Sequence, residues 1–131
     1  MIQKEKDLLL KDLCARLPYN IIVEYESRIY ILNEIDPACK DIEYITVRIQ
    51  DVEKLMCAKN VMLENIKPYL FPLSSMTDEQ KQEYQHITER WMYDSSYSIS
   101  DSIDWLNKNN FDYRGLIPMG LANDATGLNI Y

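Results

Sequence analysis

The first apolar pattern along the chain has the period of a helix. Leu9, Leu13 and Leu17 recur every four residues, and charged side chains occupy the opposite face. Pro18 follows directly, and a proline ring removes an amide donor and clashes with the preceding helical turn. The pattern therefore predicts one amphipathic helix within residues 1–17.

A second pattern, with the period of a strand, begins after this helix. Tyr25, Ile29 and Ile31 share one parity, which predicts two antiparallel strands that turn these side chains toward the core. A three-residue loop at 26–28 brings the two apolar sides together, whereas a two-residue loop would place Tyr25 beside Arg28. We therefore expect the three-residue loop.

Two further alternating segments extend the predicted sheet. Residues 42–49 and 60–65 carry apolar side chains at every second position. Short strands that follow one another without intervening helices favour an antiparallel sheet. We therefore expect a small, curved antiparallel sheet within residues 21–66, and its strand number and short connections favour an SH3-like barrel. The two prolines of residues 66–76 predict an irregular connector after the sheet.

Two helices are predicted after this connector, within residues 77–110. Thr77 opens the first with a capping box, because its hydroxyl and the glutamine three residues further on can bond otherwise unpaired amides. Ser98 or Ser100 caps the second helix, whose buried side is expected to include Ile103.

The remaining tail, residues 111–131, has an unusual composition for a terminus. It contains all three glycines of the chain, and residues 114–121 are largely apolar. Free tails are normally polar, so we expect an irregular tail that docks on its own domain, with docking on a second chain left open. The whole pattern predicts a single α+β domain over residues 1–131.

The charge balance bears on the choice of partner. The chain has 131 residues, with 21 acidic and 14 basic side chains and a formal net charge of −7. A nucleic-acid backbone is held by clustered cations, and the sequence contains no such cluster, so direct nucleic-acid binding is not expected. The acidity most simply provides solubility, and an acidic surface that mimics DNA is the alternative.

Cysteine usage and hydropathy indicate a cytoplasmic protein. The three cysteines, Cys14, Cys39 and Cys57, are odd in number and widely spaced, unlike a secreted disulfide framework. The first residues are charged and lack the apolar core of a signal peptide. Apolar runs are too short to span a membrane. We therefore expect free thiols, no membrane association and a reducing compartment.

The sequence contains no recognisable catalytic pattern. Its first 114 residues lack glycine, which removes the glycine-loop phosphate motifs, because those loops need backbone without a Cβ close to phosphate. His86 is the only histidine, and neither cysteines nor carboxylates complete a zinc-ligand spacing around it. No catalytic residue, metal or cofactor is predicted, and the sequence favours a protein without enzymatic activity.

Three tyrosines and two arginines are the candidate binding residues. Tyr19, Tyr69 and Tyr113 lie in predicted connectors, and tyrosine is favoured at interfaces because its apolar ring ends in a hydroxyl. The alternative is that these tyrosines line the edge of a small core. Arg16 and Arg114 lie within apolar segments, so each is expected either to pair with a buried carboxylate or carbonyl or to contact a partner.

Several blocks of sequence carry a resemblance to known proteins. The blocks are Asp12-Leu-Cys-Ala-Arg-Leu-Pro-Tyr19, Ile66-Lys-Pro-Tyr-Leu-Phe-Pro-Leu-Ser-Ser-Met-Thr77, Phe111-Asp-Tyr-Arg-Gly-Leu-Ile117, Gly120-Leu-Ala122 and Ala125-Thr-Gly127. They resemble a set of uncharacterised small proteins encoded by gut Bacteroides-type bacteria and by their phages and prophages. The resemblance implies an accessory protein of a phage or mobile element in a bacterial cytoplasm. It implies no activity and no functional residues, and we expect the block positions to be mostly architectural.

Together these observations predict a non-catalytic protein-binding module that contacts a host or phage protein. The first alternative is a small-ligand or nucleotide binder, or an enzyme of an unrecognised type. It requires a pocket lined by groups such as His86, Arg90 or Arg114. An acidic DNA mimic is the second alternative. The sequence leaves the oligomeric state open, a homo-oligomer included.

Overall fold

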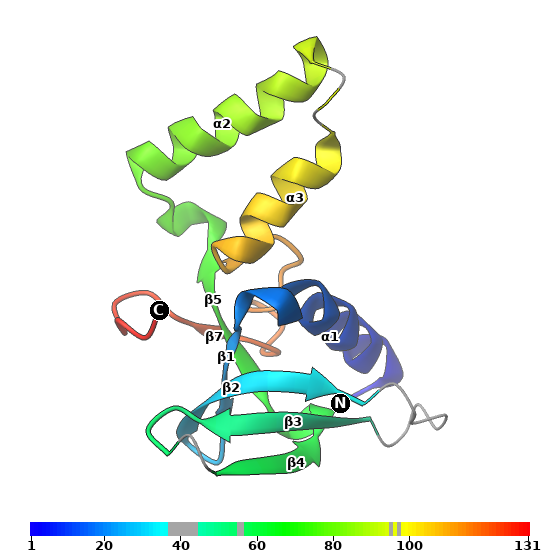
Figure 1. The fold of residues 1–131 in the computed structure, drawn as a ribbon. Helices are drawn as coiled ribbons and strands as arrows, with labels where there is room; N and C mark the ends of the chain where they lie inside the picture. The colour runs from blue at the N-terminus through cyan, green and yellow to red at the C-terminus, as the bar shows by residue number, and fades with distance from the viewer. Residues whose placement is uncertain (37–44, 55–56, 95, 97) are drawn as a thin grey trace.

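The computed structural model describes residues 1–36, 45–54, 57–94, 96 and 98–131. Along the chain, the elements are α1 (Gln3–Arg16), η1 (Leu17–Tyr19), β1 (Ile22–Tyr25), β2 (Arg28–Ile35), β3 (Thr46–Asp51), β4 (Ala58–Met62), η3 (Leu63–Asn65), β5 (Lys67–Pro72), η4 (Leu73–Ser75), α2 (Asp78–Tyr93), α3 (Ile99–Lys108), β6 (Phe111–Asp112) and β7 (Asn123–Asp124). The described residues thus form three α-helices and a curved seven-stranded sheet (Figure 1), which confirms the predicted α+β class.

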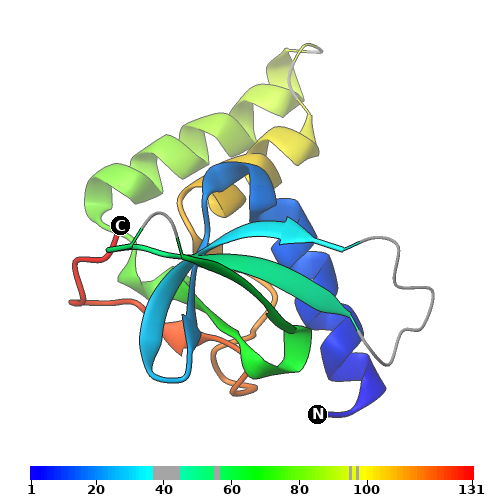
Figure 2. The same cartoon turned by 60° about the horizontal axis from the view of Figure 1, so that its bottom comes forward.

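The sheet has the strand order β4-β3-β2-β1-β5-β6, and β7 pairs with β5 beside this path. Strands β1 to β4 form an antiparallel meander, and β5 is antiparallel to β1. The two-residue strands β6 and β7 instead run parallel to β5. Figure 2 shows how the long strands curve across α1. Among the described strands the path is open at β4 and β6, so the SH3-like barrel stays a prediction.

The predicted strands at 42–49 and 60–65 correspond to β3 and β4. Residues 42–44 lie outside the described residues, and β3 continues to Asp51. β4 lies earlier than predicted, and a turn of 3₁₀ helix, η3, takes the place of its expected end.

The turn between β1 and β2 has two residues, so the predicted three-residue loop is wrong. Tyr25 stands opposite Arg28 in the ladder. Glu26 and Ser27 have φ values of 47° and 63°, the left-handed conformation of a type I′ turn. This turn matches the right-handed twist of the flanking strands, which outweighs the cost of positive φ in residues other than glycine.

The short turn reverses which side chains of β2 face the core. Val23 stands opposite Tyr30, and Tyr30 and Leu32 are buried. Ile29, which the alternation placed inside, is 36% exposed. Both faces of this hairpin carry apolar side chains, so the alternation alone did not distinguish them.

Residues 67–72 form strand β5, so the prediction of an irregular connector is wrong over this stretch. Val23 and Glu24 of β1 pair with Pro68 and Lys67, and β5 then leaves β1 to meet β6 and β7. Pro68 has no amide donor, and prolines are tolerated where a strand leaves its ladder. The sheet therefore extends well beyond residue 66.

The main core lies between α1 and the sheet (Figure 1). Leu9 and Leu13 of α1 are fully buried, as the helical pattern predicts. Their cluster includes the following side chains: Ile21, Val23, Tyr30, Leu32, Ile45, Val47, Ile49, Val61, Leu63, Ile66, Leu70, Leu116, Leu121 and Ala122.

Helices α2 and α3 form a hairpin that projects from the sheet (Figure 1). The predicted capping box of α2 is present, with Thr77 N donating to Gln80 Oε1 at 2.9 Å and Gln80 N donating to Thr77 Oγ1 at 3.2 Å. Trp105 of α3 stacks on Phe111 at 5.7 Å and packs against Tyr84 of α2 at 5.5 Å, both between ring centroids. This second cluster joins the hairpin to the end of β5.

The tail docks on its own chain. Leu116, Leu121, Ala122 and Ala125 are buried. The buried carboxylate of Asp112 accepts hydrogen bonds from the backbone N–H groups at 116 and 117, both at 2.9 Å. These bonds close a tight turn that carries the tail back under β5, where its two short strands pair.

Candidate functional site

A charged junction lies where α1 meets the start of the tail. The fully buried Arg16 donates from Nε to Asp12 Oδ2 at 2.8 Å and from Nη2 to Asp12 Oδ1 at 3.1 Å. Its Nη2 also donates to the backbone oxygen of Phe111 at 2.6 Å. Arg114 donates from Nη1 to the same Asp12 Oδ1 at 2.8 Å. One carboxylate is therefore shared by two guanidinium groups.

Tyr113 completes this arrangement from the tail. The Cζ atoms of Arg16 and Arg114 lie 5.5 and 4.6 Å from the centroid of its ring, within the range of cation–π attraction. Its hydroxyl donates to Asn107 Oδ1 of α3 at 2.9 Å. We call Asp12, Arg16, Asn107, Tyr113 and Arg114 the arginine junction.

The interactions of the arginine junction are ion pairs and hydrogen bonds that hold elements of the fold together. Both arginines pair with a carboxylate, and Arg16 also with a carbonyl, which confirms the pairing expected from the sequence. A guanidinium stays protonated at any physiological pH, so the two arginines offer no proton for acid–base catalysis. The arginine junction instead connects α1, α3 and the tail through charge-assisted hydrogen bonds.

The structure brings three of the five candidate binding residues together and leaves two elsewhere. Arg16, Tyr113 and Arg114 meet in the arginine junction, whereas Tyr19 is half-buried in η1. Tyr69 is half-buried on β5 and donates to Glu24 Oε2 of β1 at 3.2 Å. Desolvation, and next the charge of Glu24, raise the pKa of Tyr69. Contact of these residues with a partner stays a prediction.

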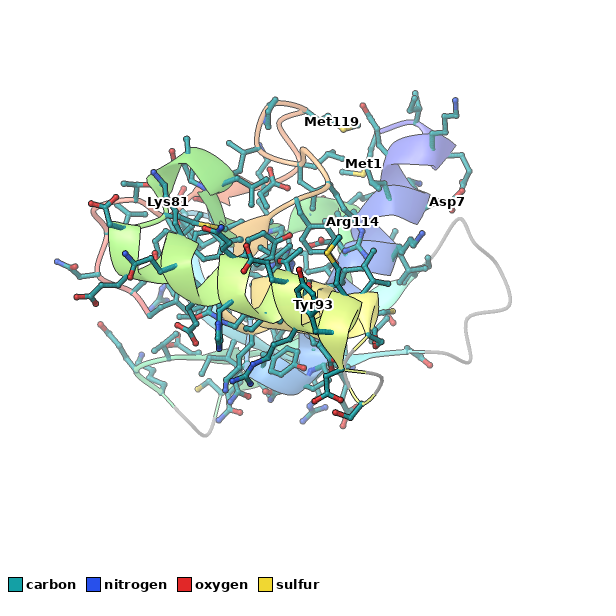
Figure 3. All side chains as sticks on the ribbon, turned by 90° about the horizontal axis from the view of Figure 1, so that it is seen from above. Met1, Asp7, Lys81, Tyr93, Arg114 and Met119 are labelled. Atoms are coloured by element: carbon teal, nitrogen blue, oxygen red, sulfur yellow. The ribbon has the colours of Figure 1, made fainter. Side chains whose placement is uncertain are left out.

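Four exposed apolar side chains lie toward the far end of the α2–α3 hairpin. Met92 and Tyr93 end α2 and are 66% and 89% exposed, and Ile99 and Ile103 on α3 are 65% and 39% exposed. α2 ends at the top of Figure 1, and α3 begins below it; Figure 3 labels Tyr93 near the end of α2. The prediction that Ile103 is buried is therefore wrong. We call these four side chains the hairpin end.

The helical pattern of α3 did not indicate the hairpin end. The buried residues of α3 are at 102, 105, 106 and 107, and positions 99 and 103 fall within the arc that these positions span on the helix. The charge of the hairpin is distinctive: residues 78–108 contain seven acidic and three basic side chains, a formal net charge of −4. The exposed apolar side chains thus belong to a hairpin with net negative charge.

The histidine and the described cysteines are surface residues. His86 is exposed on α2, and Cys14 and Cys57 are exposed free thiols, whereas Cys39 lies outside the described residues. Desolvation by neighbouring atoms nevertheless raises the pKa of Cys14, which disfavours its reactive thiolate. In the described part of the chain, no three histidine, cysteine or carboxylate side chains gather in a way that could hold a metal ion.

Two hollows flank residues 126–130 of the tail. One, of about 470 Å³, is lined by Ile22, Ser27, Arg28, Ile29, Asp51, Val52, Glu53, Asn129 and Ile130. The other, of about 240 Å³, is lined by Phe71, Ser75, Thr77, Gln80, Phe111, Thr126 and Gly127. Neither hollow is lined by a histidine or by a residue of the arginine junction.

No protein-family model, no curated protein and no solved structure matches the chain at a significant level. Within the described residues, no helix combines the length and the apolar character needed to cross a membrane.

Proposed function

We propose that this chain is a non-catalytic protein-binding module, an accessory protein of a phage or mobile element, and that the hairpin end is its contact surface. The observation that carries the proposal is the exposure of the four apolar side chains there, above all Tyr93 at 89%. Exposed apolar side chains favour association, because a partner removes their surface from water. Methionine and aromatic side chains are also enriched at protein interfaces.

The position of the surface supports the same function. The base of the hairpin contacts the rest of the chain through Trp105, Phe111 and the arginine junction. The hairpin end projects away from the sheet (Figure 1). A preorganised surface binds without the cost of ordering a loop. The phage or mobile-element context rests on the sequence resemblance alone.

A pull-down from bacterial host lysate tests the proposal, with proteins, nucleic acids and small molecules all identified. The full chain is compared with a Tyr93→Ser/Ile99→Ser double variant and with Met119→Ser as the matched control. Met119 is also an exposed apolar side chain, at 47%, but belongs to the tail. We expect a stoichiometric protein partner that the control retains and the double variant loses, with affinity for the purified partner at least about tenfold weaker.

Other outcomes would contradict the proposal. A partner retained by the double variant would remove the hairpin end from the interface. Recovery of a nucleotide or metabolite instead of a protein would favour the ligand-binding alternative, although the two hollows are not lined by His86, Arg90 or Arg114 as that alternative required. A DNA-binding protein released by added DNA would favour the acidic mimic.

A further inference from the structure

The pairing of β1 with β5 ends after two residue pairs. The strands pair at Val23↔Pro68 and Glu24↔Lys67, so the next pair in register would be Ile22 and Tyr69. The hydroxyl of Tyr131 lies there instead. It accepts a hydrogen bond from Ile22 N at 3.1 Å and donates one to the backbone oxygen of Tyr69 at 2.7 Å. The backbone oxygen of Ile22, at 3.4 Å, is a second and longer acceptor. One phenol oxygen thus bridges the donor of one strand and the acceptor of the other.

The surroundings of this hydroxyl suit a neutral phenol. The Tyr131 ring packs against Phe71 with 5.8 Å between centroids. Desolvation is the main reason that the pKa of Tyr131 lies well above its ordinary value, and the backbone N–H of Ile22 and the charge of Arg16 offset only part of it. A phenol keeps its proton here and can donate while it accepts, which neither a phenylalanine nor an aliphatic side chain can do.

The segment that leads to Tyr131, residues 127–130, makes few backbone hydrogen bonds to the rest of the described chain. Leu128 is 49% exposed and Tyr131 itself 46% exposed. Among the described residues, the backbone bond that ties residues 128–131 to the chain is Leu128 N to Ala125 O, at 3.2 Å. Gly127 and Asn129 have φ values of 79° and 52°, so the segment follows an irregular path rather than a strand. Its attachment depends mainly on the tyrosine side chain.

Unfilled space adjoins this segment on both sides. The 470 Å³ hollow includes the apolar side chains of Ile22, Ile29 and Val52 beside Ile130. The 240 Å³ hollow includes Phe71 and Phe111 beside Thr126 and Gly127. A peptide that placed a tyrosine in the same position would find room and apolar surface for the residues on either side of it.

We propose that the gap between β1 and β5 is a binding slot for a tyrosine side chain. Tyr131 fills the slot from the chain's own tail, and an extended tyrosine-bearing segment of another protein takes its place by displacing residues 127–131. The slot selects tyrosine because it presents a backbone donor, Ile22 N, and two backbone acceptors, Tyr69 O and the more distant Ile22 O, to a single hydroxyl. It lies apart from the hairpin end and does not depend on the function proposed above.

Chemical rescue of the full-length Tyr131→Ala variant tests the slot. We expect 4-methylphenol to raise the melting temperature of this variant saturably, by roughly 2–5 °C, while toluene, which has the ring without the hydroxyl, has a much smaller effect. The wild type, whose slot is filled, and a Tyr93→Ala control should not respond to either compound. Equal effects of the two compounds, or an equal response of the wild type, would overturn the proposal.

A peptide titration extends the test to the proposed occupant. A fluorescent Leu-Asn-Ile-Tyr peptide should bind Tyr131→Ala more tightly than the wild type, and its Leu-Asn-Ile-Phe counterpart about five- to tenfold more weakly. Peptides that bind alike, or a wild type that binds as well as the variant, would exclude displacement. If Tyr131→Ala does not fold, Tyr131→Phe keeps the ring, and faster hydrogen exchange of the Ile22 amide than in wild type is expected. Unchanged exchange there would exclude the slot.

Discussion

Asp12 is a single carboxylate that pairs with two arginines, Arg16 on the same helix and Arg114 in the tail. It is fully buried, its partner Arg16 is fully buried, and the Arg114 side chain is only 16% exposed. Removing a buried ion from a paired cluster leaves an uncompensated charge in a region of low dielectric, which is costlier than the loss of the hydrogen bonds alone. Arg16 already has one buried nitrogen, Nη1, without a hydrogen-bond partner among the described residues.

At the scale of the residue, we therefore predict that Asp12→Ala lowers the free energy of unfolding by about 3–5 kcal/mol. Urea denaturation followed by circular dichroism measures the change. Asp7→Ala is the matched control, because Asp7 is exposed on the same helix and should change stability by less than about 0.5 kcal/mol. Similar stabilities for the two variants would show that the arginine junction contributes little to folding.

The sequence contained part of this cluster. Asp12 and Arg16 stand four residues apart in a predicted helix, where opposite charges meet on one face. Nothing local indicated that Arg114, 102 residues away, would share the same oxygen. That contact exists only because the tail returns to the end of α1.

At the scale of the element, the helices were the most predictable parts. The predicted capping box at Thr77, whose side chains stand three residues apart, was confirmed at the start of α2. Among the side chains of α2 that the structure describes, none is buried. Because α2 gains little from burial, its capping interactions matter more than they do for a core helix.

We predict that Thr77→Ala lowers the free energy of unfolding by about 1 kcal/mol and frays the first turn of α2. Denaturation gives the first quantity, and hydrogen exchange of the amides at Gln80 and Lys81 gives the second. Ser74→Ala, an exposed hydroxyl just before the helix, should leave both unchanged within about 0.5 kcal/mol. Unchanged exchange in Thr77→Ala would mean that packing against α3, and not the cap, holds this turn.

The sheet was less predictable than the helices. In the β1–β2 hairpin, Ile29 and Ile31 alternate with Tyr30 and Leu32, so either face had an apolar set to bury. The turn decided the outcome, because two residues in the left-handed conformation set the register. A sequence without glycine at that turn gave little indication of this conformation.

At the scale of the whole molecule, the described residues form two separate apolar clusters. The larger lies between α1 and the sheet, and the smaller joins Trp105, Leu106 and Phe111 to α2 and the end of β5. Trp105 is central to the smaller cluster, since it touches both Phe111 and Tyr84. The hairpin should therefore open more readily than the sheet.

We predict that Trp105→Ala costs about 3–5 kcal/mol and accelerates hydrogen exchange in α2 much more than in β2 and β3. Ile103→Ala, a truncation on the exposed side of α3, is the control and should have a small effect. Native-state exchange monitored residue by residue measures both. Equal acceleration in α2 and in the sheet would show that the hairpin and the sheet unfold together.

The sequence by itself determined the α+β class, the three helices, the capping box of α2, the succession of the first four strands and the pairing of Arg16 with a carboxylate. These features depend on spacings of two to four residues, which local geometry converts directly into structure. The turn at Glu26 and Ser27 set the register of β2, which side-chain alternation had left open. Tertiary structure alone decided the conversion of the proline segment into β5 and the parallel pairing of the tail. It also decided the sharing of Asp12, the exposure of the hairpin end and the position of Tyr131 between two strands. Each of these depends on which surfaces meet across long stretches of chain, and side-chain periodicity does not contain that information.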